Sequence, residues 1–147
     1  MRAHSRFLMA IMALLALGLT GCSGDGAEDS SPAATEPSEG LPAVPDDEFV
    51  DMTGQAEIII EARDNKFVPK FVTISPGTEI TFDNKGRTAH NVIPVDESQF
   101  ASIPTDDLQP GDTAVLTFDD PALYPYYCSL HGTPSAGMDG RIRVAGS

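Results

Sequence analysis

Short runs of apolar, β-branched and aromatic residues recur along the chain from residue 55 onward, and turn-forming residues separate them. In residues 56–62, Ile58 and Ile60 fall on one face of an alternating pattern. Comparable runs occupy residues 71–74, 78–83, 88–94, 113–118, 124–128 and 140–144. Several short strands at this spacing, with no helical period among them, predict an all-β protein with the architecture of a β-sandwich.

The connections between these runs contain the residues that turns require. Ser75-Pro76-Gly77 and Asn84-Lys85-Gly86 each separate two runs. Residues 95–112 contain Pro104, Pro110 and Gly111, which predicts an irregular connection with room for one helical turn.

The first third of the chain has a different composition. Residues 1–21 combine basic residues with an apolar run from Phe7 to Leu19, which is the pattern of a signal peptide. Leu19-Thr20-Gly21-Cys22 resembles the lipobox of bacterial lipoproteins, which implies that Cys22 carries a lipid and becomes the new N-terminus. An ordinary secretory leader cleaved near Ser23, or an uncleaved anchor, is the alternative.

Residues 22–54 are rich in Ser, Gly, Ala, Pro, Asp and Glu and poor in large apolar residues. Such a composition cannot repay the entropy of ordering, so we expect a lipidated Cys22 followed by a disordered acidic tether. A tether of this length would reach roughly 30 Å. Residues 55–147 are then the folded domain, and Glu48-Phe49-Val50 is the weak sign of an additional strand in the tether.

The charge of the chain excludes one class of partner. The formal charge is −13, and loss of Arg2 and Arg6 with the leader would take it to −15. Nine acidic residues between Asp25 and Asp51, with no Lys or Arg among them, supply much of that charge. Nucleic acid is therefore not an expected partner.

Soft and imidazole side chains are scarce after the leader. His90, His131, Cys128, Met52 and Met138 are the His, Cys and Met residues that follow Cys22. Three of them lie on one segment, Cys128 to Met138, and His90 would have to come from another strand. Each has a simpler interpretation as a core residue or a satisfied buried histidine. Their spacing as a set instead predicts one metal site.

Two imidazoles, one thiolate and a weak axial thioether suit copper in both oxidation states. Zinc also accepts two His and one Cys, but it favours a stronger fourth ligand or water and has no redox change. The residues therefore favour one type 1 copper ion that alternates between Cu(I) and Cu(II).

The sequence from Tyr127-Cys128-Ser129-Leu130-His131 through Ala136-Gly137-Met138 to Ile142 resembles the copper loop of the cupredoxins, especially the plastocyanin and pseudoazurin group. Ala89-His90-Asn91-Val92 is similar to their upstream histidine strand, and the resemblance extends over nearly all of residues 56–145. It implies a Greek-key β-sandwich in which His90, Cys128 and His131 are equatorial copper ligands and Met138 is the axial one. It also implies that Asn91 braces the histidine strand against the cysteine loop.

One departure from the plastocyanin-type pattern concerns the axial ligand. Six residues separate His131 from Met138, two more than in that pattern, so the loop must bulge. Met52 is the rival thioether, but it falls in the predicted tether.

The function expected is that of a blue copper protein, a one-electron carrier between redox protein donors and acceptors outside the cytoplasm. The chain should be a monomer on the outer face of the cell membrane or in the periplasm, attached to the membrane through its lipid. Copper storage or delivery is the alternative, although exposed Met- or His-rich clusters are missing from the sequence. An enzyme is not expected, because copper oxidases and copper nitrite reductases need a second copper site in another domain.

Overall fold

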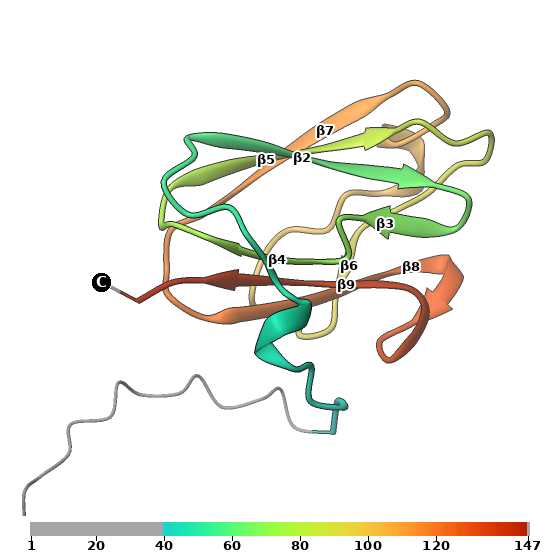
Figure 1. Cartoon of the computed structure of the whole chain (residues 1–147). Coiled ribbons are helices and arrows are strands. Elements are labelled where there is room, and N and C mark those ends of the chain that lie inside the picture. The colour runs from blue at the N-terminus through green and yellow to red at the C-terminus, as the bar shows by residue number, and fades with distance from the viewer. Residues whose placement is uncertain (1–39, 147) are drawn as a thin grey trace, which may run out of the picture. The chain divides into compact units, whose positions relative to one another are not determined.

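The computed structural model describes residues 40–146, which form two β-sheets packed face to face (Figure 1). The five-stranded sheet has the order β1 (Val50–Asp51), β4 (Phe71–Ile74), β9 (Ala136–Val144), β8 (Leu123–Thr133) and β6 (Ile93–Pro94). The four-stranded sheet has the order β3 (Lys66–Val68), β2 (Glu57–Arg63), β5 (Thr78–Asn84) and β7 (Thr113–Phe118). There are two single-turn 3-10 helices among these residues: η1 (Asp46–Glu48) precedes β1, and η2 (Thr105–Asp107) lies between β6 and β7. The predicted β-sandwich is therefore confirmed.

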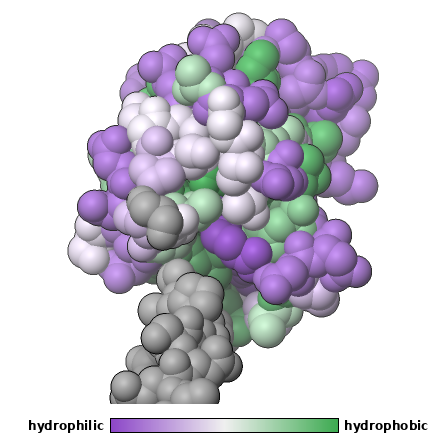
Figure 2. All heavy atoms as spheres, turned by 60° about the vertical axis from the view of Figure 1, so that its left-hand side comes forward, coloured by the Kyte–Doolittle hydropathy of each residue, from purple (hydrophilic) through white to green (hydrophobic). Residues whose placement is uncertain are grey.

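Because side chains alternate between the two faces of a strand, every second residue of β2 points between the sheets. Ile58, Ile60 and Ala62 of β2 are buried, while the residues between them are exposed or half-buried. Three aromatic rings join the sheets at the centre of the core, since Phe67 and Phe82 both make edge contacts with Tyr126. Hydrophilic residues cover much of the face shown in Figure 2, and hydrophobic ones show there only in scattered places. Burial of the apolar side chains between the two sheets supplies the main free energy of folding.

Turn chemistry accounts for a strand that the sequence pattern missed. β3 pairs with β2 through a two-residue turn, Asp64-Asn65, in which both residues have positive φ. Asn and Asp tolerate that conformation better than other non-glycine residues, and it matches the twist of a two-stranded hairpin.

The strand predicted at residues 88–94 is largely absent, and only Ile93–Pro94 pairs as β6. The backbone before it bonds to the irregular connection instead. The His90 N–H donates to the Leu108 carbonyl at 3.1 Å, and Val92 forms an isolated bridge with Ile103. The helical turn expected in residues 95–112 is present as η2.

The end of the predicted tether is not disordered. β1 extends the five-stranded sheet by pairing parallel to β4, and the Met52 N–H donates to the Thr73 carbonyl at 2.8 Å. Ahead of it, the Phe49 ring packs against Phe71 in a tilted arrangement, with centroids 5.6 Å apart, and the Arg143 guanidinium lies 3.8 Å from the Phe49 centroid. The ordered domain therefore begins before residue 55, because these aromatic contacts repay the ordering of a short segment. Residues 1–39, including the predicted leader and Cys22, lie outside the described residues.

Removing residues 40–54 should destabilise the domain. A chain beginning at residue 55 loses the Phe49 contacts and the β1–β4 pairing, which we expect to cost about 1 to 3 kcal/mol relative to a chain beginning at residue 40. The Arg143–Asp46 ion pair should add little, because the Asp46 side chain is 91% exposed. Thermal denaturation of the two chains measures the difference, and Phe49→Ala in the longer chain should reproduce part of the loss. Equal melting temperatures would show that the segment contributes no stability.

Candidate metal centre

Three potential ligand atoms meet at one end of the sandwich. The Nδ1 atoms of His90 and His131 lie 3.2 Å apart, and Cys128 Sγ lies 3.8 Å from the first and 3.6 Å from the second. A point equidistant from all three would be roughly 2 Å from each, which is the length of metal–nitrogen and metal–thiolate bonds. The three side chains thus fit around a single metal ion as they stand.

The surroundings of these atoms favour a retained metal. Cys128 and His90 are fully buried, whereas His131 is half-buried and reaches the surface. The pKa of His90 is lowered mainly by burial and, to a smaller extent, by the nearby His131. The ring is consequently kept neutral, which is the form that binds a metal.

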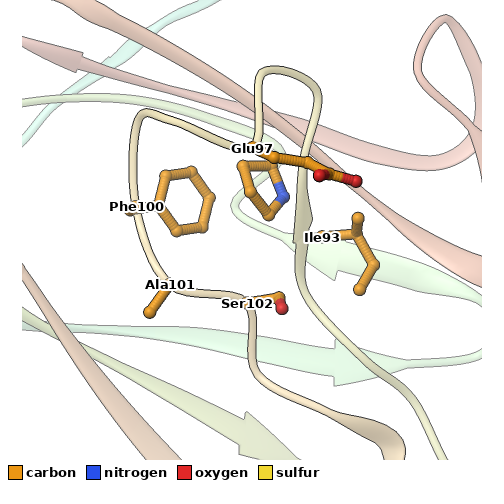
Figure 3. A pocket seen from close by; sticks show the side chains of 6 residues that line it. Ile93, Glu97, Phe100, Ala101 and Ser102 are labelled. Carbon is orange, nitrogen blue, oxygen red and sulfur yellow. The ribbon is translucent and has the colours of Figure 1, made fainter.

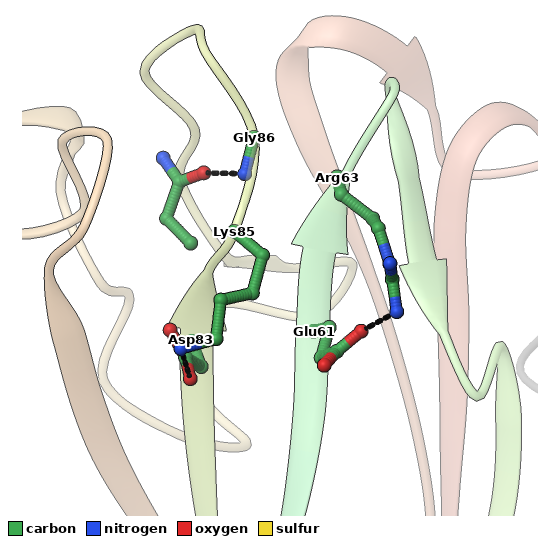
Figure 4. A network of polar contacts seen from close by, with 6 residues as sticks. Glu61, Arg63, Asp83, Lys85 and Gly86 are labelled. Atoms are coloured by element: carbon green, nitrogen blue, oxygen red, sulfur yellow. Dashed lines mark hydrogen bonds and ion pairs between the residues drawn. The ribbon is translucent and has the colours of Figure 1, made fainter.

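His90 is positioned by the loop between β5 and β6. Asn84, at the end of β5, donates from Nδ2 to the carbonyls of Leu108 and Thr88 at 2.8 and 2.9 Å, and its Oδ1 accepts from the Gly86 N–H. A Cβ on Gly86 would lie 3.3 Å from His90 Nε2, so the glycine lets the loop approach the imidazole closely. Figure 4 shows the bond to the Gly86 N–H together with two ion pairs, Glu61–Arg63 on β2 and Asp83–Lys85 at the end of β5.

Asn91 ties the two ligand-bearing segments together, as the sequence resemblance implied. Its Oδ1 accepts from the Ser129 N–H at 2.8 Å, and its Nδ2 donates to Ser129 Oγ at 2.9 Å. A further contact at 3.4 Å reaches Thr105 Oγ1 on η2. The side chain next to His90 therefore holds the residue that follows Cys128.

The segment between His131 and Met138 forms a tight hairpin tip. Gly132 pairs with Gly137 and Thr133 with Ala136, leaving Pro134-Ser135 as the turn, and the register of β8 and β9 shifts between Tyr127 and Gly132. Gly137 has a φ of 81°, and a Cβ there would lie 2.7 Å from the His131 carbonyl oxygen. The extra residues are thus taken up by strand pairing.

Met138 occupies the position expected of an axial ligand on this hairpin. Its side chain is fully buried and faces the core from the start of β9, directly after the tip that carries His131. Met52 follows β1 beside Ile74, and Ile74 pairs with Val144. That places Met52 six residues along the sheet from Met138, or about 20 Å. The strand register therefore removes Met52 as a rival.

A surface pocket beside β6 does not coincide with this centre. It is lined by Ile93, Pro94, Glu97, Phe100, Ala101 and Ser102 (Figure 3). None of these six residues is a His, Cys or Met, so the pocket offers no soft ligand.

Residues 55–145 match the copper binding proteins of the plastocyanin/azurin family. The chain belongs to this family. Plastocyanin of Solanum crispum is 36% identical over 100 residues, which are 60% of this chain and 98% of that protein. Plastocyanin of Sambucus nigra is 33% identical over 100 residues, with the same two coverages. The protein is therefore a cupredoxin, and copper is its cofactor.

Solved structures agree with this placement. A purple cupredoxin from Nitrosopumilus maritimus matches with a TM-score of 0.50 and 28% identity, over 62% of this chain and all of that one. A copper-containing nitrite reductase from Thermus scotoductus matches with a TM-score of 0.51 and 26% identity, but this chain spans only 23% of it. Amicyanin, at 21% identity and a TM-score of 0.52, supports the fold alone.

Loss of the Asn91 side chain should loosen the centre before any metal is added. Asn91→Ala leaves the Ser129 N–H without its acceptor in a partly buried site, which we expect to lower the free energy of unfolding of the metal-free protein by about 1 to 3 kcal/mol. Urea denaturation measures this change. Ser98→Ala, which removes an exposed hydroxyl bonded to Asp96, should change it by much less. If the two variants are equally stable, Asn91 does not brace the site.

Proposed function

We propose that this cupredoxin is a one-electron carrier whose copper is held by His90, Cys128 and His131, with Met138 as the weak axial ligand. The convergence of two Nδ1 atoms and one Sγ atom around a common point is the observation that carries the proposal. Copper, when bound by such a set, supplies a one-electron couple between Cu(I) and Cu(II).

The protein's own contribution is a rigid and mostly dry environment. Cys128 lies in the buried part of β8, and His90 lies in a buried loop whose backbone bonds to Leu108. The bonds from Asn91 to Ser129 join the two segments, so the ligand atoms have little freedom to rearrange. Small rearrangement between oxidation states is what rapid electron exchange requires. Storage or delivery, the alternative function, favours exposed ligands that release metal readily, and two of the three grouped ligands are fully buried.

Electron exchange with a partner protein would take place at the end of the sandwich where His131 reaches the surface. Leu130 beside it is 52% exposed, and Ala136 and Gly137 on the hairpin are small and exposed. An uncharged surface of this kind allows a redox protein to approach the imidazole closely. We propose donors and acceptors that are themselves redox proteins, and a monomeric carrier.

An enzymatic role is less well supported. The likeness to nitrite reductase covers a domain-sized part of that protein, and its activity does not follow from 23% of its length. Within residues 40–146, one set of His, Cys, Asp or Glu side chains lies close enough to share a metal ion, and it consists of His90, Cys128 and His131.

The carrier would work outside the cytoplasm, on the outer face of the cell membrane or in the periplasm. This proposal rests on the sequence of residues 1–21, read as a signal peptide, and on the lipobox-like Leu19-Thr20-Gly21-Cys22. No helix among residues 40–146 is long and apolar enough to cross a bilayer. A lipid on Cys22 would then tether the domain to the membrane.

Copper loading should turn the oxidised protein intensely coloured, because a short bond from Cu(II) to a thiolate absorbs visible light strongly. Cys128→Ser should abolish the colour, which absorption spectroscopy and metal analysis of both proteins would record. A copper-loaded wild type that stays colourless would exclude the type 1 site.

The same measurement separates the two methionines. Met138→Gln should retain copper but shift the spectrum and lower the potential, since the axial ligand tunes this class of site. Met52→Leu is the matched control and should leave both unchanged. The reverse outcome would show that the axial assignment is wrong.

The lipid on Cys22 predicts that the mature N-terminus carries a thioether-linked diacylglycerol. Cys22→Ala should release the protein from the membrane fraction or leave it with its leader attached, because the acidic segment that follows cannot bind anionic lipid. Mass spectrometry of the wild-type N-terminal peptide decides the matter. An unmodified N-terminus at Ser23 or beyond would contradict the lipid anchor.

A further inference from the structure

A buried carboxylate lies directly beside the candidate axial ligand. Asp139 follows Met138 in β9 and pairs across the sheet with Tyr127, the residue before Cys128. Adjacent Cα atoms are about 3.8 Å apart, so Asp139 is next to a ligand-bearing residue on its own strand and opposite the neighbour of another. It is only 3% exposed, which is unusual for an aspartate.

The Asp139 side chain is on the opposite side of the five-stranded sheet from the side chain of Met138, the proposed axial ligand. Side chains alternate along β9, so Asp139, Arg141 and Arg143 project away from the core that receives Met138, Ile142 and Val144. The nearest cation is Lys70, whose Nζ lies 2.9 Å from Asp139 Oδ1. The contact has the distance of an ion pair without the alignment of a hydrogen bond, so the attraction is mainly coulombic.

The two partners are unequally hydrated. The Asp139 side chain is 4% exposed and the Lys70 side chain 45% exposed. Water and salt screen an exposed charge much more than a buried one. The negative charge should therefore act on its surroundings more strongly than the ammonium that accompanies it.

The charge of Asp139 also reaches neighbouring groups. Burial is the larger cause that raises the pKa of Tyr126, and the Asp139 charge adds to it. Arg141 lies two residues along the same face. Burial lowers its pKa, and the Asp139 charge offsets only part of that lowering. Tyr126 lies in the core two residues before Cys128, so the field of Asp139 extends through the sheet toward the copper site.

We propose that the Lys70–Asp139 pair tunes the reduction potential of the copper site, with Asp139 favouring the oxidised ion and Lys70 opposing it. This inference rests on the proposed function, because it needs a copper ion beside Met138. The physical basis is that Cu(II) carries one more positive charge than Cu(I), so a nearby fixed negative charge stabilises it preferentially. Neither residue touches the metal, and both act through the field.

The two halves of the pair should therefore shift the copper couple in opposite directions. At a fixed applied potential, Asp139→Asn should raise the ratio of Cu(I) to Cu(II) several-fold. Lys70→Gln should lower that ratio by a smaller factor, and this smaller effect should shrink as salt is added. The double variant should fall between the single variants. Spectroelectrochemical titration of the copper-loaded full chain measures all three.

A matched ion pair on the same sheet face provides the control. Arg143 contacts Asp46 at 2.8 Å, but it lies five residues beyond Met138, about 16 Å along the strand. Arg143→Gln removes a cation as Lys70→Gln does, and it should leave the couple almost unchanged. An equal shift in both variants would overturn the proposal, since it would reflect net charge rather than position.

Opposite shifts are the result that a purely structural role cannot produce, because structural damage moves both variants the same way. If Asp139→Asn does not fold, Lys70→Gln decides alone, and an unchanged couple in that variant overturns the proposal. A coloured wild type with a normal one-electron couple and no opposite shifts would refute this inference only. A wild type without such a couple would instead refute the proposed function.

Discussion

The antiparallel pairing of β8 with β9 is the interaction on which the metal centre depends. The two strands carry Cys128, His131 and Met138, and the shift in their register between Tyr127 and Gly132 lets the chain fold back over the site. Glycines at the tip allow the backbones to approach within distances that a Cβ would not permit. β4 and β6 pair with this hairpin on its two sides, and Phe67 and Phe82 of the other sheet pack against its Tyr126.

Burying polar ligands in such a core has an energetic cost, and the structure limits it in two ways. The ligand atoms face one another, so each has a polar neighbour. The buried Asn91 amide is satisfied by the Ser129 N–H, which donates to its Oδ1, and by the Ser129 hydroxyl, which accepts from its Nδ2. A preorganised site of this kind needs no large change in the protein when a metal binds.

Strands with a regular side-chain pattern could be predicted from the sequence, whereas those defined by their partners could not. Residues 71–74 and 113–118 form strands with the predicted bounds, because alternation and β-branched residues coincide there. Residues 88–94 were also predicted to form a strand, but the N–H groups of His90 and Val92 bond to the loop at 103–108. The pattern indicated β1 only weakly, through Glu48-Phe49-Val50, and did not indicate β3, because two or three residues contain too little periodicity. The grouping of His90 with Cys128 and His131 was predictable because few other residues can bind a soft metal. Buried Asp139 was not, since a charged residue in a strand is normally read as exposed.

The segment from η1 to β1 separates the metal centre mechanically from whatever precedes it in the chain. Tension applied from the N-terminal side would act on the Arg143–Asp46 pair and on the contact between the Phe49 and Phe71 rings before it reached β2. Met52 is bonded to β4 about 20 Å along the sheet from Met138, so a pull would first load the sheet at a distance from the ligands. The contacts of this segment would therefore resist such a pull before it reached the strands that carry the ligands.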